Sequence, residues 1–186
     1  VVGYSLPSYL VGIVFIYLFA VKLKIFPVGG AKTPGSTYTG FAEFADRMYY
    51  MALPILVLVF IGLAGMTRTV RAAMIDTLTQ DYIRTARAKG LKEKVVIYSH
   101  AWRNALLPVS TSIMGWIISV FTGGSLVIET TFALNGTGRL YWQALNNTDY
   151  ELVLAMQMFY TVVSLVGVLL TDLSYGLVDP RVRVNK

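Results

Sequence analysis

Four long apolar stretches constrain this chain more than any other feature of its sequence. They run from about Tyr4 to Leu23, Tyr49 to Met66, Leu106 to Ile128 and Leu152 to Val178. A helix needs roughly 20 mostly apolar residues to cross a bilayer core of about 30 Å, and none of the four shows the two-residue alternation of a half-buried strand. The sequence therefore predicts an all-α, polytopic membrane helix bundle with four transmembrane helices, forming a single transmembrane domain over residues 1–186.

Composition supports a membrane protein. Only 14% of the 186 residues are charged and 55% are hydrophobic, whereas a soluble domain carries about 25% charged residues. The chain has no cysteine, which excludes a disulfide framework and a thiolate metal or redox site. Its net charge of +6 is weak support for nucleic-acid binding, because the basic residues lie beside apolar spans and no aromatic and basic platform accompanies them.

The basic residues also predict the orientation of the spans. Eight lie in the segment 67–105 between the second and third spans and three in the tail after the fourth, against five in the two segments on the opposite side. Because segments rich in Lys and Arg stay in the cytoplasm, we expect the loop 67–105 and the C-terminus to be cytoplasmic. Val1 is then cytoplasmic as well, and an even number of spans is expected ahead of it. The chain has no signal-peptide pattern and is expected to be the C-terminal part of a longer protein.

The two outer segments differ in kind. Pro27–Gly40 is rich in Gly, Pro, Thr and Ser, which predicts an irregular loop. Glu129–Glu151 contains a turn at Asn135–Gly138, followed by apolar residues at helical spacing. This spacing predicts a short helix on the outer surface.

The cytoplasmic loop predicts two short helices that meet at a glycine. Apolar residues spaced by four from Arg71 to Lys89 indicate an amphipathic helix, and Gly90 supplies its stop. A second helix follows from Glu93 to Trp102, before Pro108 opens the next span. Such an elbow either docks a partner or anchors the chain to anionic lipid by its charge, and composition leaves both interpretations open.

The residues of this loop resemble a known family. Asp81–Leu91 (DYIRTARAKGL) followed by His100–Pro108 (HAWRNALLP) is similar to the cytoplasmic EAA loop of importer permeases for peptides, nickel and related solutes. Arg84 and Thr85 stand where the general pattern has Glu and Ala, and Arg103 stands where it has proline. These departures resemble the peptide-permease variant of the loop.

The resemblance covers nearly the whole chain. Further segments similar to the family are Pro27–Gly30, Glu129–Phe132, Gly138–Leu140, Asp149–Tyr150 and Asp172–Arg183. Because the family has six spans, the resemblance implies that the four predicted here are the last four. This agrees with the cytoplasmic N-terminus deduced from charge.

The family uses its loop as a coupling elbow, which seats in a groove of a separate ATPase subunit. The resemblance implies that the ATPase-coupling residues are Ala86, Ala88, Lys89, Gly90, Leu91, Lys92, Glu93 and Val96. It also implies a second homologous permease subunit, an extracytoplasmic solute-binding protein and a bacterial or archaeal cell membrane. The chain has no G-x-x-x-x-G-K-[ST] loop, so we expect ATP and magnesium in the ATPase partner, no cofactor here and no enzyme activity.

Two groups of residues inside the spans have alternative interpretations. A stripe of small residues, Thr111, Gly115, Ser119 and Gly123, lets helix backbones approach closely. It indicates either an interface with a second permease subunit or packing within this chain. The polar residues Gln157, Tyr160, Thr161 and Ser164 either line a solute path or form hydrogen bonds between helices.

Ionisable residues give little support to catalysis. Asp172 is the clearest one within a span, but it lies near the cytoplasmic end with Arg181 and Arg183 close in sequence, which favours an interfacial ion pair over a proton relay. His100 is the only histidine, and without a second His or a Cys nearby it predicts no metal site.

These observations predict a permease subunit of an ATP-driven importer that moves peptides or a similar small solute by alternating access. A permease for nickel or glutathione in the same family is the alternative. An ion-coupled carrier or a membrane-embedded enzyme is the alternative from a different class, and either would need convergent ionisable residues inside the spans.

Overall fold

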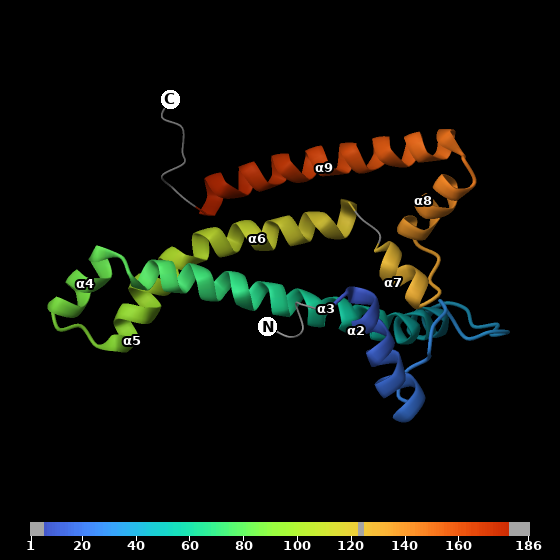
Figure 1. Ribbon diagram of the computed structural model, residues 1–186, viewed down its shortest axis with the longest axis horizontal. Coiled ribbons are helices and arrows are strands. Elements are labelled where there is room, and N and C mark those ends of the chain that lie inside the picture. Colours follow the sequence, from blue (N-terminus) through green and yellow to red (C-terminus); the bar gives the residue numbers. More distant parts are fainter. Residues whose placement is uncertain (1–5, 123–124, 179–186) are drawn as a thin grey trace. The chain divides into compact units, whose positions relative to one another are not determined.

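The structure is a computed structural model that describes residues 6–122 and 125–178 (Figure 1). Over these residues it contains helices, turns and loops but no strand. The elements, in chain order, are α2 (Ser8–Phe15), η1 (Ile16–Lys22), α3 (Phe41–Leu78), α4 (Asp81–Ala88), α5 (Glu93–Val95), η2 (Val96–Trp102), α6 (Arg103–Thr122), α7 (Leu126–Thr131), α8 (Thr137–Asn146) and α9 (Tyr150–Val178). The prediction of an all-α fold is confirmed.

Two helices of the described residues are long and apolar enough to cross a membrane. These are α3, with 38 residues, and the segment Tyr150–Leu170 of α9, with 21 residues. Together with the helical content they make the chain an all-α membrane helix bundle. The other two predicted spans correspond to a shorter apolar helix, Ser8–Lys22, and to α6, which has 20 residues. That these two also cross the membrane stays a prediction.

Several helix ends differ from the predicted spans. The first predicted span begins at Tyr4, outside the described residues, and its helix begins at Ser8. The third was predicted to run to Ile128, but α6 ends at Thr122, and Ile128 belongs to α7. Within α7 the backbone N–H of Ile128 donates to the side chain of Ser125 at 3.4 Å, so a local N-cap starts a separate helix there.

The prediction of one amphipathic helix from Arg71 to Lys89 was wrong. Its first part, up to Leu78, extends α3, and the helix breaks at Thr79 and Gln80 before α4 begins. Both breaking residues donate from their side chains to the backbone oxygen of Asp76, at 2.8 Å and 3.2 Å. Polar side chains that bond the backbone locally compete with helical hydrogen bonds, which apolar periodicity alone does not reveal.

A further correction concerns Pro108, which lies inside α6 rather than at its start. The segments α5, η2 and α6 follow one another without interruption from Glu93 to Thr122. A proline inside a helix removes one backbone donor and can kink the helix without ending it. The helix therefore continues through the boundary that the proline was expected to set.

The chain divides into two compact units. Unit 1 comprises Val1–Ala64 and Gly123–Tyr160. Its buried core draws on α2, η1, α3 and the segment around α7, and consists of Val11, Ala20, Leu53, Val57, Ile128, Phe132 and Leu134. Phe132 is the largest fully buried side chain of the described residues, so it anchors the outer part of the chain.

The predicted irregular loop Pro27–Gly40 has no helix or strand and is held to unit 1 at two points. The backbone N–H of Gly30 donates to the backbone oxygen of Phe132 at 2.8 Å. Thr33 donates from its backbone and from its hydroxyl to the two carboxylate oxygens of Asp46, at 2.8 Å and 2.6 Å. Its ordering thus comes from polar links to residues that are distant in sequence.

Unit 2 comprises Gly65–Thr122 and Thr161–Lys186. One of its clusters joins α3 to α6 and is centred on Ala73, Ala105 and Val109. The other joins α4 to η2 and is centred on Ile83, Ala86, Val96 and Ala101, with Met74 and Leu78 of α3 packed against it. This second cluster lies beneath the elbow.

Candidate functional site

The predicted elbow is present in unit 2, and a left-handed glycine forms its corner. The backbone of Gly90 has a φ of +74°, a conformation that costs residues with a Cβ but not glycine. Its N–H donates to the oxygen of Arg87 at 2.9 Å, and the N–H of Leu91 donates to the oxygen of Ala86 at 3.4 Å. These two bonds satisfy carbonyls at the end of α4, as expected for a glycine that stops a helix.

An exposed segment stands at the corner. We define the tip as the residues Ala88–Glu93, and all six are exposed. The tip contains two lysines, Lys89 and Lys92, and the apolar Leu91, which is 40% exposed. It therefore offers a mixed basic and apolar surface.

Two of the predicted coupling residues lie elsewhere. Ala86 is 6% exposed and Val96 is not exposed at all, and both belong to the cluster beneath the elbow. Their burial means that neither side chain reaches a partner directly. They hold α4 against η2, and the six residues of the tip remain as the candidates for contact.

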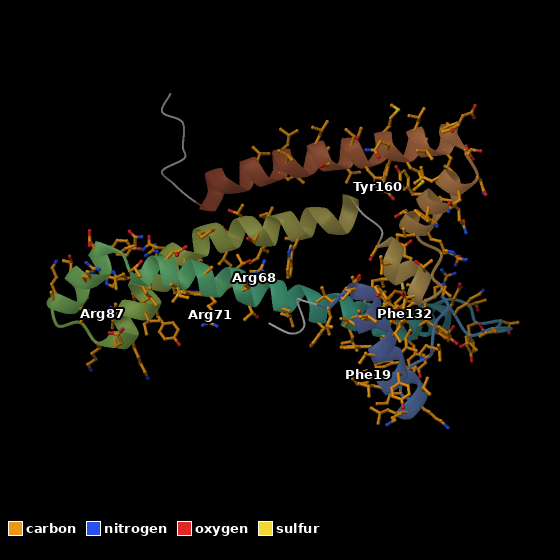
Figure 2. All side chains as sticks on the ribbon, in the orientation of Figure 1. Phe19, Arg68, Arg71, Arg87, Phe132 and Tyr160 are labelled. Atoms are coloured by element: carbon orange, nitrogen blue, oxygen red, sulfur yellow. The ribbon has the colours of Figure 1, made fainter. Side chains whose placement is uncertain are left out.

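A pair of hydrogen bonds closes the elbow. Arg87 of α4 donates from Nη2 to Oε1 of Glu93 at 2.7 Å and from Nε to Oε2 at 3.3 Å. Arg87 is labelled on the elbow in Figure 2. The hydrogen bond from Arg87 lowers the pKa of the Glu93 carboxyl, and the same bond raises the pKa of the Arg87 guanidinium. Both groups thus stay charged at neutral pH.

The small-residue stripe lies on α6, except for Gly123, which is outside the described residues. Thr111 and Gly115 are exposed. Apart from its chain neighbours and the backbone of its own helix, no atom of the described residues lies within 4 Å of the position that a Cβ at Gly115 would take. Both interpretations of the stripe, packing within this chain and an interface with a second subunit, stay predictions.

The predicted pathway residues lie along α9 and are not equivalent. Gln157, Thr161 and Ser164 are exposed, whereas Tyr160 is half-buried. The ring of Tyr160, which is labelled in Figure 2, packs edge to face on Tyr141 of α8, with centroids 6.4 Å apart and an interplanar angle of 67°. Tyr160 thus packs within unit 1, and the two interpretations of the four residues, a solute path and hydrogen bonds between helices, stay predictions.

The ionisable residues singled out from the sequence show no further chemistry. Asp172 lies in α9, while Arg181 and Arg183 lie outside the described residues, so the predicted ion pair stays a prediction. His100 is half-buried in η2. Among the described residues, no group of three or more His, Cys, Asp and Glu is arranged to hold a metal ion.

A contact between α7 and the start of α8 in unit 1 was not predicted from the sequence. Oε2 of Glu129, on α7, accepts a hydrogen bond from the backbone N–H of Arg139 at 2.7 Å. This places a carboxylate at the positive N-terminal end of α8, where it stabilises the helix. An open pocket of about 420 Å³ lies there, lined by Asn135, Gly136, Thr137, Arg139, Leu140 and Gln143. Local capping patterns span only three residues, so they do not identify a cap that comes from an earlier helix.

Comparisons with known proteins agree with the geometry. The family described as binding-protein-dependent transport system inner membrane component matches residues 1–184. The oligopeptide transport system permease protein AppB of Bacillus subtilis is 42% identical over 181 residues, covering 97% of this chain and 56% of that protein. The dipeptide transport system permease protein DppB of the same organism is 38% identical over 186 residues, covering 100% of this chain and 56% of that protein.

A relative from another organism gives the same result. The dipeptide transport system permease protein DppB of Escherichia coli (strain K12) is 37% identical over 201 residues, covering 99% of this chain and 59% of that protein. The chain thus spans little more than half the length of these three relatives. The match to the family extends over almost every residue, including the elbow, the outer segments and the last helix. This chain belongs to the family of binding-protein-dependent transport system inner membrane components.

Proposed function

We propose that this chain forms part of the permease subunit of an ATP-driven importer for peptides, and that the tip of its elbow docks on a separate ATPase subunit. The membership of the family and the names of the relatives support the transport role. The observation that carries the docking role is the contrast between the exposed tip and the buried cluster beneath it. A loop that only lies in solvent does not need an apolar core of its own. A docking element does need one, because it must keep its shape when the partner moves it.

The elbow has a direct structural connection to a predicted membrane helix. The helical run from Glu93 to Thr122 continues from α5 through η2 into α6, and Ala105 and Val109 at its start pack on α3. A displacement of the tip therefore moves the beginning of α6. ATP binding and hydrolysis in the partner would tilt the elbow and so alternate the access of the solute path.

The assignment to an importer also implies the energy source, the partner subunits and the orientation of the chain. The energy source, ATP with magnesium, is held by the ATPase partner, so this subunit has no cofactor and is not an enzyme. A second homologous permease subunit completes the path, and its contact includes the open side of Gly115 on α6. A solute-binding protein meets the outer segments, and the loop 67–105 and the C-terminus face the cytoplasm of a bacterial or archaeal cell, as the excess of basic residues supports.

A cross-link at the tip tests this proposal. The chain has no native cysteine, so Lys92→Cys in the full-length protein, with any other thiols removed, introduces a single exposed thiol. In inside-out vesicles that contain the whole transporter, we expect a disulfide or short linker to trap this thiol on the ATPase subunit, with a yield that depends on nucleotide. Ser99→Cys is the matched control, because Ser99 is exposed on η2 but lies outside the tip.

The outcomes separate topology from function. A nucleotide-sensitive cross-link from residue 92, with labelling but no cross-link from residue 99, supports both the cytoplasmic elbow and the importer. If residue 92 is labelled freely from the cytoplasmic side but traps no ATPase, the topology stands and the docking role is wrong.

A further inference from the structure

Besides the chain connection through residues 89–92, the two helices of the elbow are linked at the tip by side chains and not by backbone hydrogen bonds. On one side the N–H groups of Lys89, Gly90 and Leu91 all donate back into α4. On the other side the N–H groups of Val95 and Val96 both donate to the oxygen of Lys92. In the segment 81–102, which the structure describes in full, no backbone hydrogen bond links α4 to α5, so the corner at Gly90 is the backbone's one contribution to the angle between them.

The Arg87–Glu93 pair supplies the missing link. Its two hydrogen bonds, at 2.7 Å and 3.3 Å, cross from the last turn of α4 to the first residue of α5. Arg–carboxylate pairs with two parallel bonds fix direction as well as distance. Among the hydrogen bonds of segment 81–102, this pair is the one link between the side chains of the two helices.

The position of the pair also suits the ends of both helices. A cation at the C-terminal end of α4 and an anion at the N-terminal start of α5 both interact favourably with the helix dipoles. The N-cap residue Lys92 makes no side-chain cap bond, and Glu93 is the acidic residue in the first turn of α5. Beneath the pair, Ala86 and Val96 hold the helices by apolar contact. The elbow is thus fixed at two points, one apolar and one ionic.

We propose that Arg87 and Glu93 are a positioning pair, which sets the angle between α4 and the helical run that begins at Glu93, so that a displacement of the tip is transmitted to α6 instead of bending the corner at Gly90. This inference rests on the proposed docking of the tip on an ATPase subunit. The exposed fractions of the two side chains, 45% for Arg87 and 56% for Glu93, leave the pair accessible for a docked partner to cover. Its role is in transmission, and because Glu93 also belongs to the tip, transmission is separated from docking through Arg87, which lies outside the tip.

Charge exchange tests the pair in the complete transporter reconstituted in liposomes. The variants are Arg87→Glu, Glu93→Arg and the double variant Arg87→Glu/Glu93→Arg. The readouts are the stimulation of ATP hydrolysis by the solute-binding protein of the same importer and the cross-link from Lys92→Cys to the ATPase. We expect Arg87→Glu, which lies outside the tip, to keep the cross-link, and both single variants to lose stimulation roughly two- to fivefold, the range that an exposed ion pair supports. The double variant should restore it.

Arg84→Glu is the matched control. It makes the same charge change on the same helix, but the partner of Arg84 is Asp81 within α4, at 3.7 Å, so its loss leaves the angle unchanged. Should Arg87→Glu not accumulate in the membrane, Arg87→Gln and Glu93→Gln provide the same comparison without charge reversal.

The results distinguish a failure of the positioning role from a failure of the proposed docking of the tip. The positioning role is overturned if Arg87→Glu behaves as the unmodified protein, if Arg84→Glu loses as much stimulation, if the double variant is not restored, or if Arg87→Glu loses the cross-link itself. Absence of the Lys92→Cys cross-link in the otherwise unmodified transporter overturns the proposed function instead, and the positioning role with it.

Discussion

The carboxylate of Glu129 occupies the space in which a side chain at Gly136 would begin. The backbone of Gly136 has a φ of −122°, which any residue adopts, so the backbone conformation does not require glycine here. Glycine is required because the backbone N–H of Arg139 donates to Glu129 at 2.7 Å. This hydrogen bond holds the carboxylate close to the start of α8, where a side chain at residue 136 would lie. This contact joins two segments that resembled the family in sequence without an apparent structural reason.

Gly136→Ala should therefore destabilise unit 1. The new Cβ displaces the Glu129 carboxylate and leaves the start of α8 without its cap, at an expected loss of about 1–3 kcal/mol in the free energy of unfolding. Thermal or denaturant unfolding of the purified protein in detergent measures this. In the double variant Gly136→Ala/Glu129→Ala the steric conflict is absent, so the two changes should not be additive. Additive losses would show that the two residues do not act on each other.

Gly90→Ala should destabilise the elbow, although the new side chain makes no steric clash. No atom of the described chain lies within 4 Å of the new Cβ, so the cost is the left-handed backbone alone, about 1–2 kcal/mol. Hydrogen exchange of the Val95 and Val96 amides, whose bonds to Lys92 are 2.8 Å and 3.1 Å long, should accelerate roughly 5- to 30-fold. Gly90→Asn should show a smaller change, because Asn tolerates this conformation better. Equal exchange in all three proteins would contradict the prediction.

The carboxyl of Glu93 should titrate below its ordinary value of 4.5, because the hydrogen bond from Arg87 lowers its pKa. A lowered pKa in the folded state means that the ion pair stabilises the elbow above pH 4.5 and that this contribution is lost as the pH falls through the lowered pKa. Carbon NMR of the labelled carboxyl in nanodiscs measures the midpoint. Arg87→Gln should move it back toward 4.5, whereas Arg47→Gln, which removes the separate pair with Glu43, should not. A midpoint unaffected by Arg87→Gln would rule out the assigned cause.

Gly115→Leu should impair assembly and leave the fold of this chain intact. The Cβ position at Gly115 is open within the described residues, so we expect a larger side chain to be tolerated in this chain but to block a closely packed helix of a second subunit. Co-purification of a tagged second permease subunit, together with unfolding of the isolated subunit, measures the two effects separately. Gly115→Ser keeps a small side chain and should assemble normally. Full assembly of Gly115→Leu would assign the stripe to another role.

Local sequence determined much of the helical architecture. The apolar stretches, the irregular loop Pro27–Gly40, the short outer helix and the stop at Gly90 all depend on neighbouring residues, through length, periodicity and backbone preference. For the same reason the elbow was predictable as two helices meeting at a glycine. Its docking surface and the crossing of the membrane by all four stretches are still predictions.

Only the tertiary structure decided how these segments are used. Burial of Ala86 and Val96 depends on α3, α4 and η2 meeting in one cluster, so it assigned these two residues to the core rather than to the tip. The Glu129 carboxylate caps a helix that begins after an intervening turn, and the Arg87–Glu93 pair forms because the corner at Gly90 brings two helix ends together. Spacing along the chain predicts which residues share a helix face, but contacts between elements follow from packing, because a side chain buried or bonded across a turn is selected by its neighbours in space.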